Sequence, residues 1–120
     1  MSVSVIRYSI VVLYIIALAI LSLMSGEKAT KLNPWDFSGG DKLAHLVAYS
    51  LLSFLIMYAL KQNLGKKKGL WVLIASIMYG IGLECLQYIL FTGRHFEFLD
   101  IIANIIGCTL GILIFNKLNK

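Results

Sequence analysis

Ionisable and amide side chains recur every three or four residues within otherwise apolar stretches of this chain. Asp41, His45 and Tyr49 follow one another at intervals of four, so a helix would present all three on one face. Glu84 and Gln87 form a second face of this kind. Carboxyl and imidazole groups held in one site can exchange protons with a substrate. These residue types therefore indicate acid–base chemistry or polar binding.

A third polar face combines Asp100 with Asn104, and Arg94 lies shortly before it in the chain. A guanidinium group can bind a phosphate or a carboxylate through two parallel hydrogen bonds, which makes Arg94 a candidate for binding an anionic group. The candidate catalytic residues are Asp41, His45, Glu84 and Asp100, and the candidate substrate-binding residues are Tyr49, Gln87, Arg94 and Asn104.

Composition indicates what class of protein carries these faces. Hydrophobic residues make up 59% of the 120-residue chain and charged residues 14%, whereas soluble domains average about 45–50% and about 25%. A chain this small cannot bury so much apolar surface in its own core. This excludes an ordinary soluble globule and a disordered chain. Two cysteines cannot form a disulfide framework, and the net charge of +5 lacks the basic stripe of a nucleic-acid-binding protein.

Four apolar segments are each close to the roughly 20 helical residues that cross a membrane. They are residues 5–24, 43–60, 70–91 and 98–115. We expect the first to be retained as a helix, because no signal-peptide cleavage site follows it. Short connections make successive helices antiparallel. The sequence therefore predicts an all-α membrane protein, with residues 1–120 as one domain that forms a four-transmembrane-helix up-and-down bundle.

Lys and Arg residues are divided unevenly between the two ends of this predicted bundle. Seven of the eleven lie at the end that holds both termini and residues 61–69, and such residues favour the cytoplasmic side. Residues 25–42 and 92–97 should then face outward. At 1.5 Å per residue, Glu84 lies about 21 Å from the cytoplasmic start of its helix, and His45 and Asn104 lie about 6 Å from the outer starts of theirs. The polar faces should therefore meet in the outer half of the membrane.

Small residues form a separate pattern that indicates helix packing. Gly107 and Gly111 are four residues apart, a spacing typical of close contact between membrane helices. Ser76 and Gly80 form a similar stripe on the third apolar segment. We predict that these two stripes pack against each other.

The order and spacing of the polar residues resemble the VanZ-like family of small bacterial membrane proteins. The resemblance covers residues 1–115 and rests on Asp41-Lys42-x-x-His45-x-x-x-Tyr49, Glu84-x-x-Gln87, Arg94 and Asp100-x-x-x-Asn104-x-x-Gly107-x-x-x-Gly111. The chain departs from the pattern at His95-Phe96-Glu97-Phe98, where small or polar residues are more usual. The family's namesake is associated with resistance to the glycopeptide antibiotic teicoplanin. The resemblance thus implies a cell-envelope role in the bacterial plasma membrane, without supplying a reaction.

Several kinds of function remain open for the polar faces. An enzyme would act on a lipid or lipid-linked headgroup, with His45 as general acid or base and Glu84 or Asp41 orienting it. A non-catalytic binding or helper protein would use the same residues only to hold a lipid-linked cell-wall precursor, or to hold helices together. Whether the protein is an enzyme stays open.

Metal-assisted chemistry would use His45, Asp41, Glu84 and Asp100 as ligands, but the sequence contains no paired-histidine motif. An ion-conducting path is disfavoured because the inner third of each predicted helix is almost wholly apolar. We assign no metal ligand and predict no cofactor and no nucleic-acid partner, and whether a metal is bound stays open. The expected partners are the lipid bilayer and the headgroup or precursor that the site would hold.

Overall fold

The computed structural model describes residues 2–23, 40–60, 67–90 and 98–118. These residues form four helices and contain no strand: α1 (Val3–Leu23), α3 (Gly40–Ala59), α4 (Lys68–Leu90) and α5 (Phe98–Leu118). Each helix is long and apolar enough to cross a membrane. The predicted all-α membrane fold with four spanning helices is therefore confirmed. The second helix begins three residues earlier than expected, at Gly40, and the fourth continues to Leu118.

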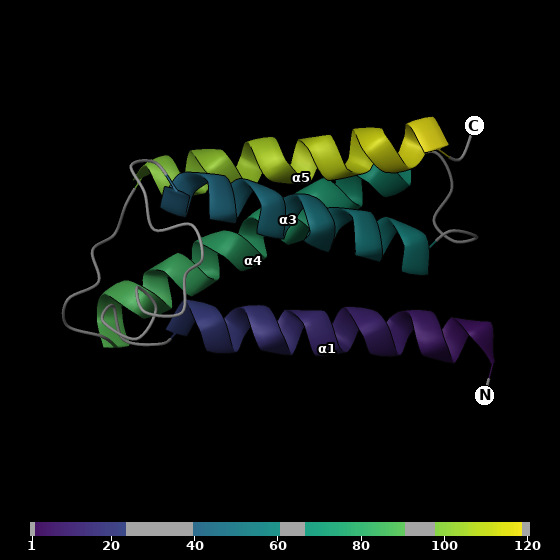
Figure 1. Cartoon of the computed structure of the whole chain (residues 1–120), viewed down its shortest axis with the longest axis horizontal. Helices are drawn as coiled ribbons and strands as arrows, with labels where there is room; N and C mark the ends of the chain where they lie inside the picture. The colour runs from purple at the N-terminus through teal and green to yellow at the C-terminus, as the bar shows by residue number, and fades with distance from the viewer. Residues whose placement is uncertain (1, 24–39, 61–66, 91–97, 119–120) are drawn as a thin grey trace.

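The helices alternate in direction (Figure 1). α1 and α4 run one way along the long axis, while α3 and α5 run the other way, so the start of α1 and the end of α5 lie at the same end of the bundle. α3 and α5 lie side by side over most of their lengths, and α4 crosses obliquely from α5 toward the end of α1 (Figure 1). The end of α4 therefore lies at the same end of the bundle as the starts of α3 and α5, but beside the end of α1 (Figure 1).

The close pairing of α3 and α5 depends on two glycines. A Cβ atom added at Gly107 would overlap the backbone carbonyl of Leu46, and one added at Gly111 would overlap the carbonyl of Ser50 and the hydroxyl of Ser53. Only glycine lets the two backbones approach this closely. The Ser53 hydroxyl lies 2.9 Å from the Cys108 carbonyl oxygen of α5 and donates across the same contact.

Gly107 and Gly111 therefore pack against another helix of the same chain, as predicted, but the expected partner stripe of Ser76 and Gly80 on α4 was wrong. Gly80 instead faces the aromatic ring of Tyr49 and the carboxamide of Asn104, since a Cβ atom there would lie 2.8 Å from Asn104 Nδ2 and 3.0 Å from Tyr49 Cε1. The two small-residue stripes thus accommodate different neighbours. Gly107 and Gly111 leave room for the α3 backbone, and Gly80 leaves room for the side chains of Tyr49 and Asn104.

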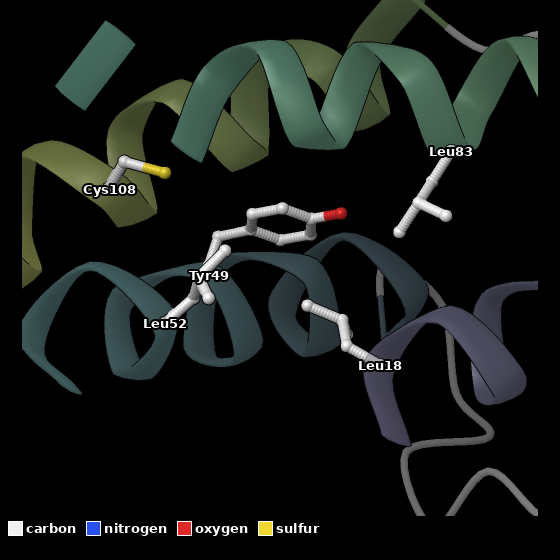
Figure 2. Close-up of a cluster of buried hydrophobic side chains, with 5 residues drawn as sticks. All are labelled: Leu18, Tyr49, Leu52, Leu83 and Cys108. Atoms are coloured by element: carbon white, nitrogen blue, oxygen red, sulfur yellow. The ribbon is translucent and has the colours of Figure 1, made fainter. Parts of the chain in front are cut away.

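The core consists of two clusters of buried side chains. The first joins all four helices through Leu18, Tyr49, Leu52, Leu83 and Cys108 (Figure 2). The second contains Met57, Val72, Ile112 and Phe115. Most remaining large apolar side chains are exposed, above all on α1 and on the outer faces of α4 and α5. Apolar side chains on the outside of the bundle suit contact with lipid, and helices satisfy their own backbone hydrogen bonds there.

Tyrosine hydroxyls attach α1 to the other helices. Tyr14 of α1 donates to the Ala48 carbonyl of α3, and Tyr79 of α4 donates to the Ile15 carbonyl of α1. Lipid provides little hydrophobic force between helices, so such interhelical hydrogen bonds contribute to association in membranes.

We predict that Gly107→Ala destabilises the bundle, because the added methyl group overlaps the Leu46 carbonyl. Overpacking of this kind costs about 1–3 kcal/mol, which should lower the thermal unfolding midpoint in detergent by several degrees. Gly82→Ala is the matched control, since a Cβ atom at Gly82 meets nothing within 4 Å and alanine is favoured over glycine in helices by about 0.5–1 kcal/mol. Equal stability of the two variants would show that α3 and α5 are not in backbone contact.

Candidate functional site

Three ionisable side chains from three helices meet near the starts of α3 and α5, where the last third of α4 passes them. His45 of α3, Glu84 of α4 and Asp100 of α5 each place one nitrogen or oxygen atom within 4.8 Å of the other two. Glu84 is 2% exposed and Asp100 is 7% exposed, while His45 is partly buried. We call these three residues the polar cluster. The structure thus brings together three of the four candidate catalytic residues.

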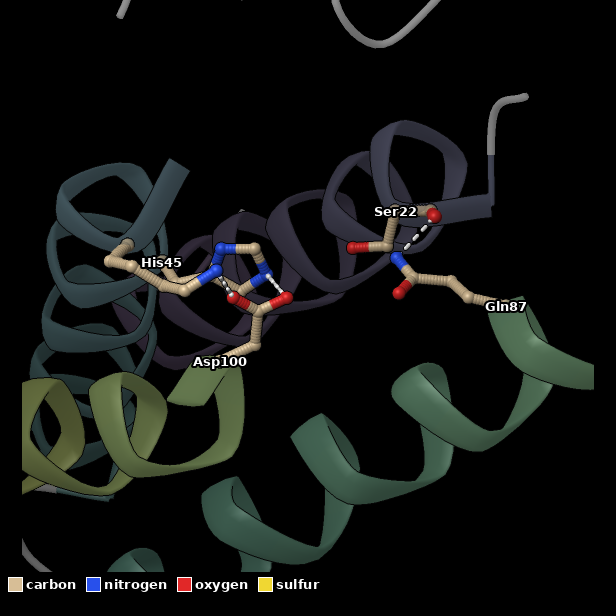
Figure 3. Close-up of polar contacts among 5 residues, drawn as sticks. Ser22, His45, Gln87 and Asp100 are labelled. Atoms are coloured by element: carbon tan, nitrogen blue, oxygen red, sulfur yellow. Dashed lines mark hydrogen bonds and ion pairs between the residues drawn. The ribbon is translucent and has the colours of Figure 1, made fainter. Parts of the chain in front are cut away.

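Asp100 is the centre of the polar cluster. Its Oδ1 atom lies 2.7 Å from the Lys42 ammonium nitrogen, and its Oδ2 atom lies 3.7 Å from His45 Nε2 (Figure 3). Lys42 and His45 are three residues apart on α3, so they share a face and approach the same carboxylate. The two oxygens of Asp100 therefore have separate neighbours, a permanent cation on one side and an imidazole on the other.

Helix geometry explains why these residues converge. Asp100 lies in the first turn of α5 and His45 in the second turn of α3, and a carboxylate in the first turn is favoured by the helix dipole. Glu84 lies near the opposite terminus of the antiparallel helix α4, at the same height. The three residues therefore come together from three helices, while their depth in the membrane stays a prediction.

A second polar layer lies one helical turn deeper. Asn104 follows Asp100 by four residues and Gly80 precedes Glu84 by four, and the Asn104 carboxamide packs against Gly80 beside the Tyr49 ring. Asn104 and Tyr49 are almost completely buried, and Tyr49 belongs to the hydrophobic core. The Asn104 Oδ1 atom is buried and accepts no hydrogen bond from the described residues. Asn104, Gly80 and Tyr49 therefore pack one helical turn below the polar cluster.

Gln87 is directed toward α1. Its Nε2 atom donates a hydrogen bond to the Ser22 carbonyl (Figure 3), and the residue is 3% exposed. The contact ties the end of α4 to the last turn of α1. Gln87 thus joins two helices through this hydrogen bond. The headgroup-binding role that the sequence suggested for Gln87 stays a prediction.

Two candidates fall partly or wholly outside the described residues. Asp41 lies in the first turn of α3, but its side chain is not described, and Arg94 lies outside the described residues altogether. Sequence reasoning did not select Lys42 as a site residue. Its spacing of three from His45 was the available signal. The Ser22 carbonyl is a backbone group, and no pattern in the sequence marks it.

Cations mark the other end of the bundle. Arg7, in the second turn of α1, lies over the Tyr58 ring at 4.8 Å, and Lys68 at the start of α4 lies over the Phe115 ring at 5.3 Å. Lys117 lies in the last turn of α5 at the same end. The described acidic side chains, Glu84 and Asp100, lie at the opposite end. Among the described residues, the far end of the bundle therefore carries cations only, whereas the cluster end carries two acidic side chains and the cation Lys42.

Comparison with known proteins identifies the family. The VanZ/LLP1 family model matches residues 5–119, nearly the whole chain. The chain belongs to the VanZ/LLP1 family. Together with the four apolar helices, this makes it a multi-pass membrane protein of the VanZ type, as the polar motifs predicted.

One curated relative is similar to part of this VanZ-type chain. An uncharacterized protein of Schizosaccharomyces pombe is 31% identical over 74 residues, which amount to 62% of this chain and 45% of the relative. The matched segment therefore spans less than half of that protein. No solved structure matches the VanZ-type chain.

Proposed function

We propose that this VanZ-type protein binds the headgroup of a lipid or lipid-linked precursor in the polar cluster, at the outer face of the bacterial plasma membrane. One observation carries the proposal: His45, Glu84 and Asp100 come from three helices and meet within 4.8 Å at one end of an apolar bundle. Ionisable groups at membrane depth are costly and usually mark functional sites. Residues that only joined helices would not need to be ionisable.

The geometry suits a polar headgroup in particular. Lys42 is directed at Asp100, so one cationic group for a phosphate or carboxylate stands beside the acidic and imidazole groups. Arg94 stays a candidate for the same role from the sequence alone. In the bacterial envelope, the resulting phenotype would be of the teicoplanin-resistance type that the family's namesake suggests.

The cluster also supports proton transfer. His45 would act as general acid or base, and Asp100, 3.7 Å from its Nε2 atom, would orient it together with Glu84. This assigns to Asp100 the orienting part that the sequence suggested for Glu84 or Asp41. The alternative is a non-catalytic protein that only holds the ligand or its own helices. The hydrogen bonds of Gln87, Tyr14 and Tyr79 to backbone carbonyls of neighbouring helices favour such a joining role for those three residues.

We predict the sidedness of the bundle from its charge asymmetry. Arg7, Lys67, Lys68 and Lys117 lie at the end away from the cluster, and Lys and Arg are enriched on the cytoplasmic side. In a background with Cys85 and Cys108 replaced by alanine, Phe98→Cys should react with an impermeant thiol reagent in intact cells. Lys67→Cys should react only after the cells are opened. The reverse pattern would place the polar cluster at the cytoplasmic face.

A functional test separates a working site from helix joining. Glu84→Gln keeps the size of a buried side chain and removes its ability to ionise, so membrane abundance and thermal stability should stay near those of the wild type. The change in lipid and precursor profile, and in teicoplanin susceptibility, that expression produces in a sensitive bacterial host should fall to the level of the empty vector.

The matched control for this test is Cys85→Ala, the adjacent but exposed position on α4, which should retain the full effect. A Glu84→Gln protein that is abundant and fully active would contradict the proposed site. A variant that is lost from the membrane would favour the joining role instead.

A further inference from the structure

We infer that the polar cluster is a binding site for a divalent transition-metal ion, with His45, Glu84 and Asp100 as its protein ligands. The inference rests on the proposed function for the role of the ion at the headgroup. The binding itself rests on the donor atoms and their spacing, and it can be measured without any lipid.

The spacing of the donor atoms is close to what one ion requires. A tetrahedral ion with bonds of about 2.0 Å separates its ligand atoms by about 3.3 Å. His45 Nε2 and Asp100 Oδ2 are already 3.7 Å apart, and a carboxylate oxygen of Glu84 lies within 4.8 Å of a ligand atom on each of the other two. Side-chain rotations of about an ångström would complete the coordination.

The chemistry of the donors selects the class of ion. One imidazole and two carboxylates, with no thiolate, suit Zn²⁺ or Mn²⁺, whereas the imidazole is a poor ligand for Mg²⁺ or Ca²⁺. A divalent ion would also lie between two buried carboxylates, Glu84 and Asp100, whose negative charges attract it strongly in surroundings of low dielectric constant. Three protein ligands leave at least one coordination position open, which is typical of catalytic metal sites.

Neighbouring residues are arranged as supports for such a site. Lys42 holds Asp100 Oδ1 at 2.7 Å, which leaves Oδ2 directed toward His45, and ligating carboxylates are commonly oriented by a partner of this kind. One turn deeper, Asn104 is 2% exposed and its Oδ1 atom has no hydrogen-bonding partner among the described residues. Its position one helical turn below Asp100 on the same helix makes that carbonyl oxygen a candidate acceptor for a water molecule bound beneath the ion.

A bound ion would give the site a defined part in headgroup binding. Its open coordination position would accept a phosphate oxygen of a lipid headgroup, or a water whose proton affinity the ion lowers. The same ion would balance the charges of Glu84 and Asp100. The inferred ligand class is therefore a metal ion together with an anionic, phosphate-bearing headgroup.

The test is metal titration of the full-length protein, purified in detergent without a polyhistidine tag and stripped with chelator. Calorimetry with Zn²⁺ and Mn²⁺ should give one ion per chain with micromolar affinity or tighter for at least one metal. Substituting Co²⁺ should give visible absorption bands of a nitrogen- and oxygen-ligated ion. His45→Phe, Glu84→Gln and Asp100→Asn should each weaken binding at least about tenfold.

Controls keep each outcome decisive. Cys108→Ala and Cys85→Ala should bind the ion normally, and the metal should raise the unfolding temperature of wild type but not of Asp100→Asn. No saturable binding by folded wild type, or binding unchanged in folded His45→Phe and Asp100→Asn, would overturn the metal site. If the lipid profile changes in a way that depends on Glu84 but not on metal, headgroup binding is supported and the metal site is not. If the protein binds metal but its expression leaves the lipid profile unchanged, the metal site is supported and headgroup binding is not.

Discussion

Placing ionisable side chains in a membrane costs free energy, and this cost constrains how the helices of this protein pack. A charged carboxylate within the hydrocarbon core is costly unless it has a polar partner, and the chain buries two carboxyl side chains, Glu84 and Asp100, almost completely. Each must therefore have a polar neighbour. Asp100 has Lys42 and His45. These contacts require α3 and α5 to start at the same height and to lie close together, which Gly107 and Gly111 permit.

This constraint divides the polar residues into two groups with different parts. His45, Glu84 and Asp100 converge on one another, whereas Gln87, Tyr14 and Tyr79 each donate to a backbone carbonyl of another helix. Residues of the second group stabilise the bundle that holds the first group in place. A membrane-embedded site of this kind is built from rigid helices, and its precision comes from packing.

The sequence predicted those features of the fold that depend on a single physical rule, such as hydropathy or the rise per residue of a helix. Hydropathy and length predicted the four helices. The rise per residue, applied to Glu84, His45 and Asn104, predicted that the polar faces of three helices meet. Sequence reasoning failed where the outcome depended on tertiary packing. The spacing of Gly107 and Gly111 indicated a close contact, but the choice of α3 over α4 follows from the bulk of Tyr49 and Asn104 at Gly80. Lys42 was counted as a loop cation because its partner, Asp100, lies far along the chain.

The measurement that tests the central claim most directly is cross-linking across the polar cluster. With Cys85 and Cys108 replaced by alanine, His45→Cys and Asp100→Cys are combined and treated in membranes with a short bifunctional thiol reagent, and intramolecular bridging is read from the intact mass. Tyr58→Cys with Asp100→Cys is the control, because Tyr58 lies about 20 Å further along α3 than His45. The account predicts efficient bridging of the first pair and none of the second. Equal bridging of both pairs, or none of either while all four thiols react singly, would contradict the convergence of α3 and α5 on one site.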